Sequence, residues 1–95
     1  MLPYSWKIIK LLFHSILLAE GISWGAVPGF DGPARVMARV RYRHTEQSAM
    51  AEVLPDGKLK VTFDTPQRAI TTGQTVVLYE GDTVLAGATI TEVGE

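Results

Sequence analysis

The sequence predicts an all-β fold, a small closed antiparallel β-barrel of about six strands. Short β-prone runs recur along the chain, separated by turn signals about 8 to 12 residues apart. Two of these signals, Asp56-Gly57 and Glu80-Gly81-Asp82, are typical of tight hairpins. Residues 34–42 alternate between apolar and mostly basic side chains, as a half-buried strand does. We favour a closed barrel over a sandwich because closure removes the exposed edges of so few strands.

The predicted elements follow one another in a simple order. Residues 16–20 are extended and apolar, and residues 25–33 form a loop because they contain three glycines and two prolines. Further strands are predicted at residues 34–42, 48–54, 58–63, 76–79, 83–85 and 88–93. Residues 64–74 are too long for a tight turn and too polar for a core strand, so we expect them to cross the mouth of the barrel.

The composition indicates one domain. The chain has 95 residues, of which 46% are hydrophobic and 20% charged, so we expect it to fold alone. We assign residues 13–95 to the domain and residues 1–12 to a leader, which is a displaced start or an added sequence. A short N-terminal helix is compatible with the single apolar face that Ile8, Ile9, Leu12, Phe13 and Ile16 would form.

The opening segment, residues 1–19, superficially resembles a signal peptide, because Lys7 and Lys10 precede an apolar run. His14 and Ser15 interrupt that run, and Glu20 stands where a cleavage site would need small residues. We therefore expect a cytoplasmic protein, and a secreted domain would require cleavage near residue 19. We expect no membrane span, which needs about 20 consecutive apolar residues.

The sequence predicts no catalytic residue and no metal site. Cysteine is absent, which excludes disulfides, thiolate ligands and cysteine nucleophiles. The nine glycines form no phosphate-binding loop. His14 and His44 lie far apart in the sequence, and we expect each to be solvated or at the edge of the core. The carboxylates of Asp56, Glu80 and Asp82 lie at turns, where solvation is their ordinary role.

One feature suggests binding, a row of arginines that we define as Arg39, Arg41 and Arg43. In a strand these three residues share one face and stand about 6.5 to 7 Å apart, close to the phosphate spacing along a nucleic-acid strand. Because the net charge is −1 and the pI about 6.1, any site for a polyanion must be a local patch of this kind.

The arginine row also has a simpler interpretation. It could be the solvated outer face of the barrel, with its guanidinium groups paired to carboxylates of Glu46, Glu52 or Glu92 on neighbouring strands. Alternation along the sequence does not separate the two interpretations.

Four further residues are weaker candidates for the same site. Lys58 and Lys60 share a polar face of the following hairpin and could extend the row. Gln67 and Arg68 lie in the predicted crossing segment, where they could either close the barrel or contact a ligand.

Several segments together resemble the C-terminal domain of the tRNA-specific 2-thiouridylases. The resemblance rests on segments 17–24, 41–43, 61–63, 66–71, 73–74, 77–82 and 85–90, in this order and spacing. It covers residues 13 to 93. Thr72 departs from the family, which usually has proline there, and Ala86-Gly87-Ala88 replaces a run of glycines.

The resemblance implies that this chain is the tRNA-holding barrel of a larger enzyme. Such enzymes place sulfur on the wobble uridine of certain tRNAs, using ATP in an N-terminal domain and two cysteines that deliver persulfide sulfur. The expected partners of this chain are therefore tRNA and the remaining domains of the parent, with no cofactor of its own. We expect a monomer. The alternative is a structural or protein-interaction barrel whose arginine face docks on a neighbouring domain and never contacts RNA.

Overall fold

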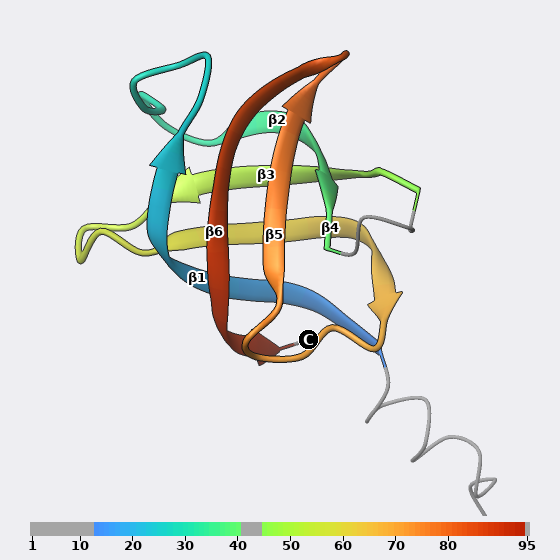
Figure 1. Ribbon diagram of the computed structural model, residues 1–95. Coiled ribbons are helices and arrows are strands. Elements are labelled where there is room, and N and C mark those ends of the chain that lie inside the picture. The colour runs from blue at the N-terminus through green and yellow to red at the C-terminus, as the bar shows by residue number, and fades with distance from the viewer. Residues whose placement is uncertain (1–12, 41–44, 95) are drawn as a thin grey trace, which may run out of the picture.

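A computed structural model describes residues 13–40 and 45–94 of the chain. These residues form six strands and no helix: β1 (Phe13–Trp24), β2 (Ala34–Arg39), β3 (Gln47–Val53), β4 (Leu59–Arg68), β5 (Thr75–Glu80) and β6 (Thr83–Gly94). The strands close into one barrel in the order β1-β4-β3-β2-β5-β6, and every neighbouring pair is antiparallel (Figure 1). The predicted all-β closed barrel is confirmed.

The core of the barrel follows from side-chain alternation. In β4, Leu59, Val61 and Phe63 are buried, and the residues between them face outward. Leu17 and Leu78 are fully buried on β1 and β5. Each such leucine stabilises the fold by about 1.5 to 3 kcal/mol relative to an exposed side chain. No polar or charged residue of the described part is buried, so the interior is entirely apolar there.

Strand β2 shows the predicted alternation over its observed length. Val36 and Ala38 are buried, while Arg35 and Arg39 lie on the opposite face. The strand ends at Arg39, three residues before the predicted end. Residues 41–44 lie outside the described part of the chain.

The connection between β4 and β5 is shorter than predicted. Residues 64–68 belong to β4 because the first residues of β1 offer them a pairing partner, with Phe13 opposite Arg68. Only residues 69–74 connect the two strands. In this segment Ile70 is buried, and Gly73 N donates to the carbonyl oxygen of Ile90 at 2.8 Å. Ile70 thus closes this end of the core.

The last two predicted strands, 83–85 and 88–93, form the single strand β6. The sequence suggested a break at Ala86-Gly87, but both residues pair with β5 on one side and with β1 on the other. A register shift between Leu78 and Tyr79 lets β5 follow the strongly curved β6. The prediction of a break was therefore wrong.

Strand β1 begins earlier and ends later than predicted. Phe13 and Ile16 lie in this strand, so the proposed helical face does not include them, and residues 1–12 are outside the described part. The strand bends at Gly21, whose φ of 68° favours glycine, and its register with β6 shifts there. In the described residues no helix is long and apolar enough to cross a membrane.

Candidate nucleic-acid interface

Arg35, the first arginine of β2, has a carboxylate partner. Its Nη1 atom lies 2.6 Å from Asp64 Oδ1 and donates a longer hydrogen bond of 3.3 Å to Ser48 Oγ. The hydrogen bond from Arg35 and the smaller effect of Ser48 lower the pKa of the Asp64 carboxyl below its ordinary value of 3.8. The positive charge of Arg35 is therefore balanced inside the domain.

Arg39 lies on the same face of β2 but has a neutral partner. Its Nη2 atom donates to Tyr79 Oη at 2.6 Å, and its guanidinium carbon is 5.1 Å from the centre of the Tyr79 ring. The register explains the contact, because Met37 pairs with Tyr79 and Arg39 with Val77 on β5. No carboxylate of residues 13–40 or 45–94 forms an ion pair with Arg39. A phenol holds the guanidinium in place and leaves its charge unbalanced.

Gln67 and Arg68 line a hollow at the same end of the barrel. The hollow has a volume of about 130 Å³, and its lining comprises Ala38, Val40, Thr45, Gln47, Phe63, Gln67, Arg68, Ala69 and Ile70. Gln67 Nε2 donates to the carbonyl oxygen of Thr65 at 2.8 Å, which orients its side chain. Arg68 is exposed and has no ion-pair partner among the described residues. Arg39 stands between Ala38 and Val40, which both line the hollow. The guanidinium groups of Arg39 and Arg68 therefore both belong to this end of the barrel.

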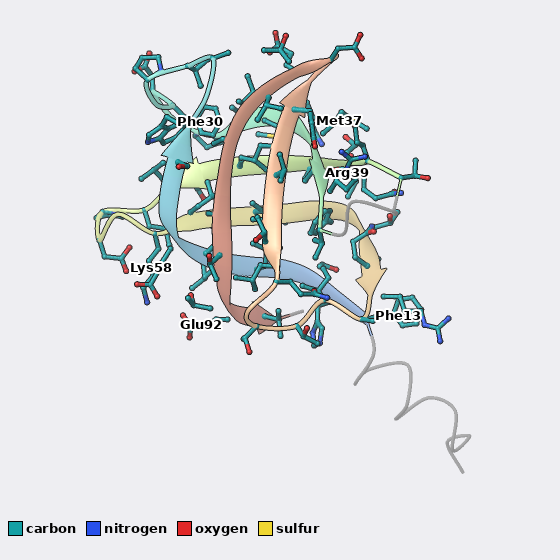
Figure 2. The ribbon with its side chains drawn as sticks, in the orientation of Figure 1. Phe13, Phe30, Met37, Arg39, Lys58 and Glu92 are labelled. Carbon is teal, nitrogen blue, oxygen red and sulfur yellow. The ribbon has the colours of Figure 1, made fainter. Side chains whose placement is uncertain are left out.

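Lys58 and Lys60 lie elsewhere. Lys58 Nζ is 3.7 Å from Glu92 Oε2, and Lys60 pairs in register with Glu52 and Leu18. Lys58 directly precedes β4 and Lys60 is its second residue, whereas Arg39 is at the end of β2, and β3 separates the two strands. Figure 2 shows Arg39 and Lys58 on different sides of the barrel. The two lysines therefore lie on other strand positions than Arg39, and their part in an extended basic row stays a prediction.

Among the residues that the structure describes, two pairings differ from those considered for a solvated outer face of the barrel. Glu92 contacts a lysine instead of an arginine, and the carboxylate beside Arg35 is Asp64. Both Asp64 and Tyr79 were missed as partners, because only the strand register places them beside an arginine. Arg41, Arg43 and His44 fall outside the described residues, so the spacing of the arginine row stays a prediction.

The part of the chain that the structure describes has few other side chains of the kinds that catalyse reactions or bind metal ions. His14 lies on β1, and its Nδ1 atom is buried without a hydrogen-bond partner. No group of three or more His, Asp or Glu side chains that could hold a metal ion occurs within residues 13–40 and 45–94. The barrel end with Arg39 and Arg68 is therefore the strongest candidate site.

Comparison with known families agrees with the fold. Residues 14–90 match the Aminomethyltransferase beta-barrel domain family, and the chain belongs to that family. Proteins named tRNA-specific 2-thiouridylase MnmA are similar to it. The one from Moorella thermoacetica is 50% identical over 74 residues, which are 78% of this chain and 20% of that protein. The one from Acetivibrio thermocellus is 45% identical over 79 residues, 83% of this chain and 22% of that protein.

A third relative, from Francisella tularensis subsp. novicida, is 49% identical over 80 residues, which are 84% of this chain and 22% of that protein. The chain thus spans about a fifth of the length of the curated relatives it matches. Within the beta-barrel family it corresponds to the C-terminal domain of tRNA 2-thiouridylases, as the sequence segments suggested.

Proposed function

We propose that this barrel binds the sugar-phosphate backbone of tRNA and positions it for a 2-thiouridylase whose reacting groups lie in other domains. The observation that carries the proposal is the Arg39–Tyr79 pair, an oriented guanidinium whose charge no described carboxylate balances. Arginine in a fixed orientation suits a phosphate, which accepts two parallel hydrogen bonds from it. Contacts of this kind set the orientation of a nucleic acid and read no sequence.

The proposed contacts differ in rank. Arg39 comes first, and Arg68 and Gln67 follow because they line the hollow at the same barrel end. Arg41 and Arg43 extend the contact along the backbone in this proposal. Lys58 and Lys60 rank last, because β3 separates their strand β4 from the β2 strand of Arg39.

The activity of the complete enzyme is part of the same proposal. The relatives are named tRNA-specific 2-thiouridylases, which supports a parent that adds sulfur to uridine of tRNA. The proposal also includes the wobble position, the use of ATP and a cytoplasmic location, which rest on the family resemblance. Within such an enzyme, Arg39, Arg68 and Gln67 would give this barrel the role of binding tRNA. A monomeric barrel suffices for it, because the contacts come from one chain.

A salt titration tests the RNA contact. The complete chain is titrated with fluorescently labelled tRNA at several salt concentrations. Affinity is expected to fall as salt rises, with a slope of the logarithmic plot of about −0.7 to −0.9 for each phosphate contacted. An absence of binding, or binding that salt does not weaken, would contradict the proposal.

A substitution separates RNA binding from a docking role of the arginine face. The triple change Arg39→Ser, Arg41→Ser and Arg43→Ser in the intact parent should lower tRNA affinity without altering domain packing. Changed solubility or changed packing of the domains, at unchanged tRNA affinity, would favour the docking role.

A further inference from the structure

The outer surface of β1 is apolar at Ile16 and Leu18, in contrast to the outer surface of β4. Residues 16–19 are all apolar, and Leu17 and Ala19 are fully buried inside the barrel. Ile16 and Leu18 therefore point outward, where β4 presents Lys60, a threonine and an aspartate. A strand that is apolar on both faces is typical of sheets covered on both sides.

These outward side chains line a shallow hollow of about 410 Å³. Its lining is Ile16, Leu18, Leu54, Lys60, Glu92, Val93 and Gly94. Gly94 pairs with Ile16 in β6 and carries no side chain, so it leaves that flank of the isoleucine uncovered. Lys60 and Glu92 flank Leu18 in register on its two neighbouring strands, and Lys58 lies 3.7 Å from Glu92. An apolar centre with a rim of both charges is the usual anatomy of a protein interface.

We propose that this hollow docks the part of the parent enzyme that precedes the barrel. The rim carries charges of both signs, which suits a folded protein surface better than a polyanion. About four-fifths of the length of each relative lies outside the matched segment. Strand β1 begins at Phe13, three residues before Ile16, so a domain that precedes this strand is tethered close to the hollow.

The topology keeps this docking face apart from the candidate RNA contact. In the ring β1-β4-β3-β2-β5-β6, strands β1 and β2 are three places apart and so lie on opposite sides of the barrel. The hollow is built around β1, while Arg39 leaves β2 toward β5. A domain on the hollow can therefore leave Arg39 accessible to RNA, whereas Arg68, which pairs with Phe13, lies closer to the docking side. The docking proposal does not depend on RNA binding.

Cysteine labelling provides the test, because the chain has no cysteine of its own. Leu18→Cys is compared in the 95-residue chain and in a chimera in which this chain replaces the matched segment of the Moorella thermoacetica enzyme. Peptide mass spectrometry follows the labelling at position 18 alone. Covering by the preceding domain is expected to slow it at least about tenfold in the chimera.

Two matched variants control this measurement. Met50→Cys lies on the outer face of β3, is also half-buried and is outside the hollow, so its labelling should be the same in both proteins. Ala51→Cys is fully buried in the core and should stay unreactive wherever the barrel is folded. Equal labelling of Leu18→Cys in the two proteins, with Ala51→Cys unreactive, would overturn the proposal. The proposal would also be overturned if Leu18→Cys were labelled much more slowly than Met50→Cys in the 95-residue chain alone. In that case residues 1–12 or a second copy of the chain would cover the hollow.

Small-angle X-ray scattering gives an independent readout. Leu18→Arg should separate the domains and increase the radius of gyration of the chimera, whereas Met50→Arg should leave it unchanged. An unchanged radius in both variants would count against docking at this hollow.

Discussion

Arg35 and Arg39 leave the same face of β2, yet they have opposite electrostatic roles. Arg35 forms an ion pair with Asp64 at 2.6 Å, whereas Arg39 donates to the phenol of Tyr79 at the same distance. Asp64 balances the charge of Arg35, whereas Tyr79 orients the guanidinium of Arg39 and leaves its charge unbalanced. The number of arginines on a strand therefore overstates its capacity to bind an anion. The partner of each guanidinium decides which of them can contact a phosphate.

The largest effect is expected from Arg39→Gln. Hydrogen bonds to charged groups contribute about 1.5 to 3 kcal/mol, so loss of one phosphate contact should weaken tRNA binding by about tenfold or more. The salt slope should also shrink by about one contact. Fluorescence anisotropy measures both quantities. The control is Arg35→Gln, which should change affinity less than about twofold because its charge is already balanced. Equal losses in the two variants would remove the distinction between the arginines.

A smaller loss is expected when Arg39 is given the kind of partner that Arg35 has. Tyr79→Glu places a carboxylate beside the guanidinium and should weaken tRNA binding by about three- to fivefold, because the phosphate must then compete with it. Thr75→Glu is the matched control, since it adds the same charge to the same outward face of β5 farther along the strand. Anisotropy titrations that give the same affinity for both variants would contradict a local effect.

Removing only the hydroxyl of Tyr79 should have a still smaller effect. Tyr79→Phe keeps the ring under the guanidinium but deletes the 2.6 Å hydrogen bond that orients it. The expected loss of tRNA affinity is about twofold, because the charge and the cation–π contact remain. If affinity were unchanged while Arg39→Gln weakened binding, the charge of Arg39 would matter and its orientation would not.

The smallest effect concerns the Arg35–Asp64 pair at acid pH. The pKa of Asp64 is lowered in the folded protein, so the pair stabilises the fold above the unfolded pKa of about 3.9 and loses this contribution as pH falls through the lower folded value. Both side chains are about half exposed, so solvent screening keeps the contribution small. Arg35→Gln should raise the Asp64 pKa toward 3.8, which a carboxyl-carbon NMR titration measures. An unchanged pKa would show that Arg35 does not cause the shift.

Hairpins and inward-facing residues were the most predictable features. Asp56-Gly57 and Gly81-Asp82 both separate paired strands, and Leu59, Val61 and Phe63 point into the core as their alternation predicted. Two strand boundaries were less predictable. Residues 64–68 carry turn-prone side chains, and they extend β4 only because the start of β1 lies beside them. Alanine and glycine at positions 86 and 87 likewise stay in β6 because both neighbouring strands pair with them.

The candidate site divides in the same way. The sequence alone identified Arg39 and Arg68 as candidates and implied a barrel, because side-chain type and strand alternation are local properties. The sequence could not show which of Arg35, Arg39 and Lys60 has a partner that balances its charge. A partner on another strand depends on the register and on the order in which the strands close the barrel. The tertiary structure decided that Asp64 balances one arginine, that Tyr79 orients the other, and that the apolar outer face of β1 lies opposite both. These outcomes bring together residues 29 and 40 positions apart, and only the closed sheet joins them.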